Sequence, residues 1–555
     1  MNLIERAQQW VDHDPDPVTA EELGSLVQAA REGDQDAELE LARAMNGPLQ
    51  FGTAGLRGEI GAGESRMNLA VVIRATAGLC AVLLKHAPRT PRVVIGCDAR
   101  YGSVDFAHAA ARVASAAGCE VLLLPLMNPT PLTAFSVREL DADAGIMVTA
   151  SHNPPRDNGY KVYLGGTVVT AAGQGVQIVP PFDAEIASAI ASAPFADQIA
   201  QNDELIVNVD PREDYIARAA SLASGSSESK ADLGITLTGM HGVGAALTKK
   251  VLEEAGFTNV TLVAEQADPD PDFPTVSFPN PEEPGAIDLA LALAGRTGAD
   301  LVVANDPDAD RCAVAAVIDD RWRMLTGDEL GLLLADHMIR RGAKGVLASS
   351  VVSSGALAAL AAARGRDHVT TLTGFKWIGR VPDLAFGYEE AIGYCCDPGA
   401  VPDKDGLTAA LMVLEMAAGL RAEGLTLADR LDELTAELGL HATSQVAIRV
   451  SDLSLIADAM ARLRQNPPTS LLHAPVTYRD LAEGTSGLPP TDAVELSGDE
   501  VHVVVRPSGT EPKLKCYLEV RLTPEKSRIG ATARSAAKPR LMALREQMQS
   551  VLGLG

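Results

Sequence analysis

The sequence is poor in aromatic residues, which make up 4% of its 555 residues, and it has far fewer basic than acidic side chains. Lys and Arg total 47 against 73 Asp and Glu, which gives a formal net charge of −26. Nucleic acid and anionic membrane surfaces are therefore disfavoured as main partners, because clustered Lys and Arg hold them. A phosphorylated small substrate is compatible with this charge, since a local Arg or helix N-terminus acts within a Debye length of about 8 Å.

Cysteine pairs and sorting signals are also missing. The seven cysteines are odd in number and form no CxxC pair, which predicts a reduced compartment. The first residues are acidic where a secretory signal is basic and then apolar. No apolar run is expected to reach the roughly 18 residues of a membrane span. We therefore expect a cytoplasmic protein with no membrane partner.

Two common catalytic motif classes are absent from the sequence. Without a G-x-S-x-G segment, ordinary serine hydrolase chemistry is disfavoured. There is neither a G-x-x-x-x-G-K segment nor a strand-linked G-x-G-x-x-G segment, so nucleotide binding is unsupported.

What the sequence has in abundance is aliphatic core material, with 46% hydrophobic residues over a length that exceeds one usual core. From Phe51 onward, short β-branched runs alternate with Ala-rich stretches, a rhythm that predicts βαβ units. The same rhythm returns twice, and after about residue 443 the sequence becomes rich in strand-like runs.

We therefore predict an α/β protein with three similar α/β domains, with mixed and mainly parallel sheets, and a smaller C-terminal α+β domain. The predicted boundaries are 1–212 for an N-terminal helical cap plus the first domain, 213–325 for the second, 326–443 for the third and 444–555 for the fourth. A deep cleft between such domains is feasible.

Three carboxylates, those of Asp306, Asp308 and Asp310, fall within five residues directly after the apolar run LVVA. They would repel one another unless a cation lies among them, and a hard divalent metal is the natural ligand for oxygen donors. An EF-hand also begins D-x-D-x-D, but its sixth residue is Gly and its twelfth is Glu, whereas Arg311 and Val317 stand here. The alternative is a solvated acidic turn.

Ser151 follows the apolar run AGIMV in a segment rich in Asn, Pro and Gly. Loops after parallel strands commonly carry reactive groups in α/β proteins, so Ser151 is a candidate nucleophile. His152 and Lys161 are near enough in sequence to handle protons or charge. A plain turn is the alternative.

Two further segments could hold an anion. Residues 506–512, RPSGTEP, offer the Arg506 fork together with hydroxyls and glycine amides. The segment FGTAGLRG at 51–58 offers Arg57. Residues 373–376, TGFK, and 387–393, GYEEAIG, could present polar groups to sugar hydroxyls. Each of these segments could equally be a plain turn or loop.

In this order, GTAGLRG, TASHNP with NGYK, NDPDADR, TGFKW, EEAIG and RPSGTEP resemble the motifs of the α-D-phosphohexomutase superfamily, the phosphoglucomutases and phosphomannomutases. The likeness runs from about residue 50 to the C-terminus. WVDHDPDP, FGTAGLRG and TLTGFKWIG resemble its long phosphoglucomutase-like branch, which includes phosphopentomutases and sugar-bisphosphate synthases. The resemblance implies four domains around one central cleft, which contribute a phosphoserine loop, a metal loop, a sugar-recognition loop and a phosphate-binding loop.

The resemblance also implies a role for each motif. The catalytic residues would be Ser151, His152, Lys161 and Arg57, with Ser151 phosphorylated. The metal ligands would be Ser151, Asp306, Asp308 and Asp310. The substrate-binding residues would be Thr53, Arg311, Thr373, Gly374, Glu389, Ala391, Lys404, Arg506, Ser508, Gly509 and Thr510.

One position departs from the family pattern. Many hexomutases carry Ser where this chain has Ala391, and a lost hydroxyl removes a hydrogen bond worth about 0.5 to 1.5 kcal/mol. The departure weakens the case for a strict glucose or mannose preference.

The implied activity is a phosphosugar mutase that interconverts sugar 1-phosphate and 6-phosphate, first of glucose and then of mannose. It would use a phosphoserine, a bisphosphorylated sugar intermediate and Mg²⁺, with a bisphosphorylated sugar such as glucose 1,6-bisphosphate as activator. The alternatives on the same fold are a phosphopentomutase and a glucose-1,6-bisphosphate synthase. A metal-dependent sugar phosphatase and a non-catalytic sugar-phosphate binder are alternatives of another class.

The general base stays open between Lys161 and His152. The expected partner is a small phosphosugar, and we expect a monomer or a weak homodimer.

Overall fold

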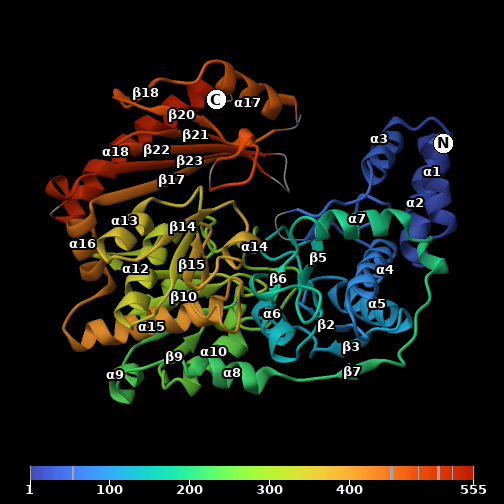
Figure 1. The fold of residues 1–555 in the computed structure, drawn as a ribbon, viewed down its shortest axis with the longest axis horizontal. Coiled ribbons are helices and arrows are strands. Elements are labelled where there is room, and N and C mark those ends of the chain that lie inside the picture. Colours follow the sequence, from blue (N-terminus) through green and yellow to red (C-terminus); the bar gives the residue numbers. More distant parts are fainter. Residues whose placement is uncertain are drawn as a thin grey trace.

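The computed structural model describes residues 2–52, 55–450, 454–485, 487–508, 513–527 and 529–553. Figure 1 shows α/β units along the lower part of the molecule, a separate sheet with helix α18 above them, and a group of N-terminal helices at the opposite end. The predicted α/β class is confirmed, with mixed sheets in the first three units and an α+β unit at the C-terminus.

The N-terminal group contains α1 (Leu3–Asp12), α2 (Pro17–Arg31) and α3 (Gln35–Ala44). The side chains of Asn2, Asp16 and Asp34 cap these helices by accepting hydrogen bonds from first-turn amides. The group has a small core of its own, and Trp10 packs against the first α/β unit. These helices therefore extend the first domain.

The first sheet has the strand order β1 (Leu56–Glu59), β5 (Asp157–Leu164), β4 (Ala144–Val148), β2 (Arg92–Cys97), β3 (Glu120–Leu123) and β7 (Ile206–Asn208), with β6 (Val176–Gln177) beside β5. Strands β4, β2, β3 and β7 are parallel, whereas β5 runs antiparallel to its neighbours. The helices of this unit are α4 (Leu69–His86), α5 (Ser103–Ala116), α6 (Thr130–Glu139) and α7 (Phe182–Ser192), with short turns η1 (Ala171–Gly173) and η2 (Ala196–Gln198).

Strand β2 has a core on each of its two faces, which explains why its sequence is continuously apolar. Val93 and Ile95 join the core under α4 and α5, whereas Val94 joins the core on the opposite face. Successive strand residues point to opposite faces, so a strand covered by helices on both sides buries all of them.

Helix α4 is long and apolar enough, by length and composition, to cross a membrane. The expectation that no run reaches this length is therefore wrong. The helix packs within the first domain, with 56% of its most apolar window buried, and contacts α5 and α7. Core helices of α/β units share this composition.

The second sheet has the order β12 (Arg321–Met324), β11 (Cys312–Ile318), β10 (Leu301–Asn305), β8 (Ile235–Thr238) and β9 (Val260–Leu262), with α8 (Arg212–Ala220), α9 (Ser227–Ala231), η3 (Ala264–Gln266), α10 (Ala245–Glu254) and α11 (Asp288–Thr297). The third has the order β14 (His368–Thr371), β13 (Val346–Ser350), β15 (Leu384–Glu389) and β16 (Gly393–Cys395), with α12 (Gly327–Arg340), α13 (Ala356–Ala363), α14 (Phe375–Ile378), α15 (Gly406–Ala422) and α16 (Leu427–Leu438). The two units share one core, in which α15 is buried almost all round.

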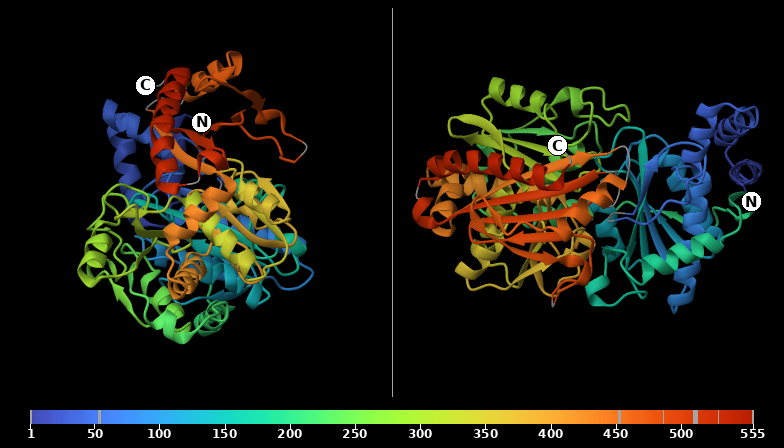
Figure 2. Two further views of the ribbon diagram at one scale, coloured as in Figure 1. Left: turned by 90° about the vertical axis from the view of Figure 1, so that its left-hand side faces the viewer. Right: turned by 90° about the horizontal axis from the view of Figure 1, so that it is seen from above.

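The fourth sheet is antiparallel, in the order β17 (Leu440–Arg449), β23 (Lys513–Leu522), β22 (Val501–Pro507), β21 (Val494–Ser497) and β20 (Thr477–Asp480). Near it lie α17 (Ser454–Gln465), β18 (Ser470–Leu471), β19 (Ala474–Pro475), η4 (Leu481–Glu483), η5 (Pro524–Lys526) and α18 (Gly530–Leu552). Helix α18 lies along one face of this sheet (Figure 2). On the other face, Val504 and Tyr517 pack against Val351 and Val352 of the third domain.

In each of the first three sheets, the strand direction reverses at an equivalent point. In each, a parallel strand is followed by a short connection and then by an antiparallel neighbour: β4 to β5, β10 to β11, and β15 to β16. We call these connections the serine loop (149–156), the aspartate loop (306–311) and the glutamate loop (389–392). Each begins where a parallel strand ends at its carboxyl edge, which is where α/β proteins bind ligands.

Candidate active site

The serine loop presents Ser151 to the second domain. Its side chain is buried and its φ of 53° lies in the left-handed region, a conformation that costs about 1 to 3 kcal/mol for a residue with a Cβ. The backbone amide of Ser151 donates to Oγ1 of Thr149 at 2.9 Å. Its Oγ donates to Oδ2 of Asp306 at 2.7 Å and lies 3.2 Å from Nδ1 of His152. The hydroxyl therefore points directly at the aspartate loop.

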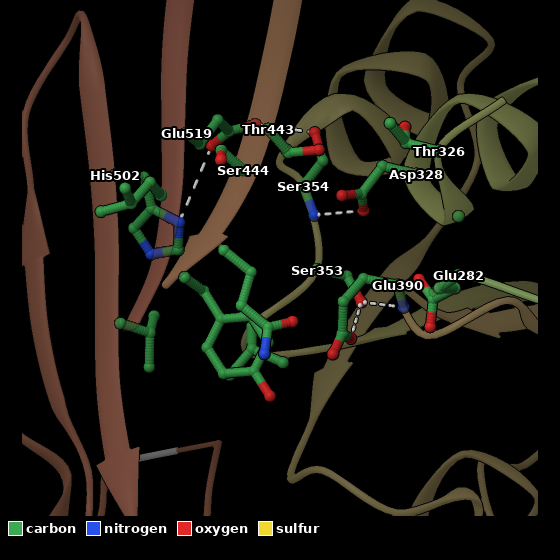
Figure 3. Close-up of a pocket in the computed structure, with 16 residues that line it drawn as sticks. Glu282, Thr326, Asp328, Ser353, Ser354, Glu390, Thr443, Ser444, His502 and Glu519 are labelled. Atoms are coloured by element: carbon green, nitrogen blue, oxygen red, sulfur yellow. Dashed lines mark hydrogen bonds and ion pairs between the residues drawn. The ribbon is translucent and has the colours of Figure 1, made fainter. Parts of the chain in front are cut away.

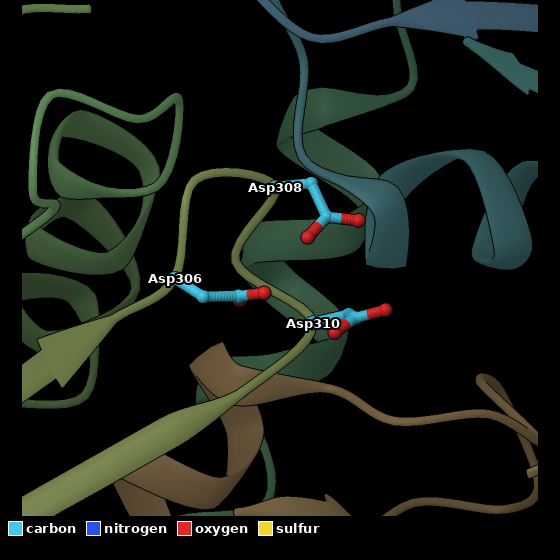
Figure 4. A group of neighbouring side chains, drawn as sticks. All are labelled: Asp306, Asp308 and Asp310. Carbon is cyan, nitrogen blue, oxygen red and sulfur yellow. The ribbon is translucent and has the colours of Figure 1, made fainter. Parts of the chain in front are cut away.

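The aspartate loop gathers three buried carboxylates. Asp306, Asp308 and Asp310 each offer an oxygen, and these oxygens lie within 4.8 Å of one another. All three side chains project to the same side of the loop (Figure 4). Oδ1 of Asp308 and Oδ1 of Asp310 are buried and have no hydrogen-bond partner within the described part of the chain. Orphaned oxygens of this kind are suited to a hard divalent cation, so the residues present fit a metal.

Nearby cations stabilise part of this negative charge. Nζ of Lys161 donates to Oδ2 of Asp308 at 2.7 Å and to Oδ2 of Asp310 at 2.8 Å, and Nζ of Lys404 lies 3.0 Å from Asp310. Burial alone would raise the pKa of Asp310, but Lys161, Lys404 and Arg311 outweigh it and hold that pKa well below its ordinary value.

Asp306 has the opposite environment. Burial, and then the charges of Asp308 and Asp310, raise its pKa well above the ordinary value. The three carboxylates thus share charge that a divalent cation would neutralise.

His152 and Arg57 lie beside the serine. Burial, followed by the charges of Arg311 and Arg57, holds the pKa of His152 well below its ordinary value, which favours the neutral imidazole. Nη1 of Arg57 donates to Oδ1 of Asn153 at 3.3 Å, while its Nε is buried without a partner among the described residues. Burial lowers the pKa of Arg57. Nε of Arg57 is therefore a buried donor without a partner in a side chain that contacts the serine loop.

The glutamate loop lies against the aspartate loop. Nη1 of Arg311 donates to the carbonyl oxygen of Ala391 at 3.1 Å. Oε1 of Glu389 accepts from the amide of Gly374 at 2.7 Å, and Gly374 has a φ of 105° that a residue with a Cβ rarely adopts. Thr373 is half-buried beside it. The structure therefore brings the sugar-recognition candidates next to the metal candidates.

Lys404 contacts both the aspartate loop and helix α14. It contacts Asp310 and Asp403, and its ammonium lies 5.5 Å from the ring centroid of Phe375, the first residue of α14. Burial would lower its pKa, but the charges of Asp310 and Asp403 raise it.

The fourth domain contributes the end of β22. Arg506 is half-buried there opposite Lys515 of β23, and the amide of Ser508 donates to the carbonyl oxygen of Lys513 at 2.8 Å. The charge of Lys515 is the smallest of the named causes that affect the pKa of His152, and it lowers that pKa. The candidates Thr53, Gly509 and Thr510 lie outside the described residues.

A separate cavity of about 140 Å³ lies between the third and fourth domains. Residues from the strands of the fourth domain face Asp328, Ser353 and Ser354 across it (Figure 3). Oε2 of Glu390 accepts from the hydroxyls of Ser350 and Ser353, each at 3.2 Å. The cavity flanks the glutamate loop and does not include Ser151 or the three aspartates.

Two residues in contact with the site were not identified from the sequence. Arg100 donates to backbone carbonyls of the serine loop, and Oγ1 of Thr130 donates to Oδ2 of Asp308 at 2.6 Å. Arg100 follows the end of β2 by three residues, so the rule that pointed to Ser151 applied to it as well. Thr130 opens α6 and offered no comparable signal.

Comparisons with known proteins agree with this architecture. The chain matches the four models described as "Phosphoglucomutase/phosphomannomutase" at residues 48–197 for alpha/beta/alpha domain I, 213–317 for domain II, 326–438 for domain III and 446–533 for the C-terminal domain.

Individual relatives extend the match to nearly the whole chain. The "Probable phosphomannomutase" of Haemophilus influenzae is 43% identical over 462 residues, covering 82% of this chain and 93% of that protein. The human "Phosphopentomutase" is 35% identical over 583 residues, covering 95% and 92%. A Paramecium crystal structure, "pp63/parafusin" in its open form, shares the fold with a TM-score of 0.70 at 19% identity, covering 91% and 95%. The chain therefore belongs to the phosphoglucomutase/phosphomannomutase family of mutases, as the resemblance of its motifs implied.

Proposed function

We propose that this mutase interconverts the 1-phosphate and 6-phosphate of a hexose, glucose first and mannose second, through a phosphoserine at Ser151. The observation that carries the proposal is the 2.7 Å hydrogen bond from Oγ of Ser151 to Asp306 within the three-carboxylate group. A serine aimed at a cation site is placed to hold a phosphoryl group, because phosphoryl transfer depends on positioning and on offsetting charge.

The reaction would proceed in two half-reactions. In the first, the bond from Oγ of Ser151 to phosphorus breaks and a bond from a free sugar hydroxyl to phosphorus forms, giving a bisphosphorylated sugar. The hydroxyl gives up its proton to a base, and Oγ takes up a proton. In the second, the sugar has turned and its other phosphoryl group returns to Ser151 with the reverse proton movements.

The residues of the chain have distinct parts in this scheme. The neutral imidazole of His152, 3.2 Å from Oγ, would hold the proton at Ser151, whereas Nζ of Lys161 is engaged by two carboxylates. Arg57 would bind the phosphoryl oxygens, and its buried Nε has no hydrogen-bond partner within the described part of the chain.

Mg²⁺ is the proposed metal, held by Asp306, Asp308 and Asp310 with an oxygen carried on Ser151. When bound, it would offset charge on the transferring phosphoryl group.

Recognition of the substrate would come from the third and fourth domains. Thr373, Gly374, Glu389 and Lys404 would face the sugar, and Arg506 with Ser508 would hold its non-reacting phosphate. A bisphosphorylated sugar such as glucose 1,6-bisphosphate would rephosphorylate Ser151 after loss of its phosphoryl group.

A pentose phosphate is the second candidate substrate. Ala391 provides no side-chain hydroxyl to a hexose, and the human relative that spans most of the chain is named a phosphopentomutase. A coupled assay over glucose, mannose and ribose 1-phosphates separates the two candidates. Release of inorganic phosphate in place of isomerised sugar would identify a phosphatase instead.

The central test is the phosphoryl group on Ser151. Intact mass should show one added phosphoryl group after incubation with glucose 1,6-bisphosphate, and Ser151→Ala should lose both this mass and turnover. Ser136→Ala is the matched control, because Ser136 is also buried in the first domain but donates to a helix carbonyl. Full turnover by Ser151→Ala would overturn the proposal.

We also propose a reducing compartment, the cytoplasm, as the site of action. All seven cysteines lie among the described residues, where each is buried and unpaired. Disulfides form mainly in oxidising compartments.

A further inference from the structure

Arg100 binds the serine loop and the first residue of β5 at four backbone oxygens. Its Nη2 donates to the carbonyl oxygens of Ser151 and Asn153, each at 2.7 Å. Its Nη1 donates to those of Pro154 at 2.7 Å and Asp157 at 3.0 Å. One guanidinium thus holds the loop on both sides of its turn, including the carbonyl of the residue with strained φ.

Arg100 is itself fixed from the opposite side. It is 3% exposed, and its Nε lies 3.6 Å from Oδ2 of Asp98. The same Oδ2 accepts from Oγ1 of Thr149 at 2.6 Å, and that Oγ1 accepts from the amide of Ser151. Asp98 and Arg100 therefore bind the serine loop through two separate routes that meet at Ser151.

The second domain contacts this arrangement at a third point. The guanidinium carbon of Arg100 lies 5.1 Å from the ring centroid of Phe273, which is 2% exposed. The neighbouring residues also pair, because the hydroxyl of Tyr101 donates to Oδ1 of Asp272 at 2.8 Å. Phe273 belongs to the domain that carries Asp306, so Arg100 joins the serine loop to that domain outside the carboxylate group.

We propose that Arg100, through Phe273, is a positioning residue that keeps Ser151 in register with the aspartate loop, so that its phosphoryl group passes to a sugar hydroxyl rather than to water. The inference rests on the proposed phosphoserine mechanism. A lysine cannot replace Arg100, because its single ammonium lacks the planar fork that reaches four carbonyls. Without that support, the strained turn at Ser151 would relax and the oxygen would shift.

The test compares Arg100→Lys with Arg366→Lys, a control in the third domain whose guanidinium also donates to two loop carbonyls, those of Ala343 and Gly345. We expect kcat of Arg100→Lys to fall about 100-fold, because a misplacement of reacting groups by about 1 Å can cost that much in rate. KM should change less than about threefold. In single turnover of the phosphorylated enzyme, the fraction of phosphoryl groups released as inorganic phosphate should rise about tenfold, because closed sites normally exclude transfer to water.

A second variant keeps the test decisive if Arg100→Lys folds poorly. Phe273→Leu removes the ring but not the loop contacts, and should raise the same water fraction by about threefold to tenfold, because a shifted phosphoryl group is less well shielded from water. Phe257→Leu is its control, because Phe257 is buried in the same domain under Lys230, with the ammonium 5.9 Å from the ring centroid.

The outcomes separate this inference from the proposed function. If Ser151→Ala is inactive but Arg100→Lys and Phe273→Leu partition like wild type, the positioning role is wrong and the mechanism stands. If Ser151→Ala is active, the mechanism itself is wrong. A change in the water fraction equal to that of the Arg366 and Phe257 controls also overturns the inference, since a purely structural defect would affect all four alike.

Discussion

Oγ of Ser151 donates to Oδ2 of Asp306 across 155 positions of the sequence, from the first domain to the second. The contact forms because β4 and β10 both end at this place and both are followed by a short turn into an antiparallel strand. His152 lies on the other side of the same hydroxyl, with its pKa depressed by burial. The candidate nucleophile, its histidine neighbour and the candidate cation site therefore lie together at one interface between two domains.

Removal of the metal should abolish turnover. We expect activity to vanish in chelator and to return best with Mg²⁺, because the group offers only oxygen ligands. Asp308→Asn should lose at least about 100-fold in kcat, since the charge that the metal offsets contributes several kcal/mol. Asp300→Asn is the control, because Asp300 precedes the same strand but is exposed and pairs with Arg421. Undiminished turnover in chelator would exclude the metal assignment.

The sequence predicted the individual residues of the candidate site better than it predicted that they lie close together. Ser151 and the three aspartates were identified because polar residues follow apolar strands, and that pattern is local. The distance between the two loops depends on how the first and second domains pack, and no local pattern contains that information. Their order along the chain resembles a known family, and this resemblance supplied the expectation of a shared cleft.

The contacts of Arg100 could not be predicted from the sequence. Its place after β2 is readable, but its four acceptors are backbone carbonyls, which leave no trace in residue types. The apolar run of α4 was underestimated for a different reason, because Arg74 and Lys85 interrupt it while mean hydropathy over the helix stays high.

Arg506→Ala should impair turnover of every phosphosugar while leaving Ser151 phosphorylated. The proposed role of Arg506 is to hold the non-reacting phosphate, and loss of one partner of such a charge pair costs about 2 to 5 kcal/mol. That energy corresponds to a fall in kcat/KM of roughly 30-fold to a few thousand-fold. Arg479→Ala is the control, since Arg479 is an exposed residue of the same sheet. A fall below about threefold would make RPSGTEP an ordinary turn.

Asp328 should make stability depend on pH. Burial raises its pKa to about 7, although the amide of Ser354 and the hydroxyl of Tyr388 donate to its Oδ1. Between the ordinary value near 4 and about 7, the folded protein binds a proton that the unfolded chain has released. The free energy of unfolding therefore falls as pH rises through this window and levels off above it.

Asp328→Asn removes this titration and keeps an oxygen acceptor. The free energy of unfolding of wild type should fall from about pH 5 to pH 8 by about 2 to 3 kcal/mol more than that of the variant, since each pKa unit is worth about 1.4 kcal/mol. Urea unfolding at both pH values measures the difference. Asp336→Asn, on the same helix but paired with Arg430, controls for an asparagine in α12. A difference that does not change with pH would show that Asp328 is charged in the folded protein.

Ala391→Ser should shift substrate preference toward hexoses. Ala391 is half-buried between β15 and β16, two residues after Glu389, and its carbonyl is already fixed by Arg311. Adding Oγ there leaves the backbone contact in place and offers one hydrogen bond to a sugar hydroxyl, worth about 0.5 to 1.5 kcal/mol. The ratio of kcat/KM for glucose 1-phosphate over ribose 1-phosphate should therefore rise roughly twofold to tenfold.

The control for this substitution is Ala400→Ser, which adds the same hydroxyl at a half-buried turn of the same domain outside the glutamate loop. Its substrate ratio should match wild type. If Ala391→Ser also leaves the ratio unchanged, the glutamate loop does not read the hydroxyl that separates hexose from pentose at this position. Specificity would then have to come from other residues that we propose to face the sugar, such as Gly374 and Lys404, which contact Glu389 and Asp310.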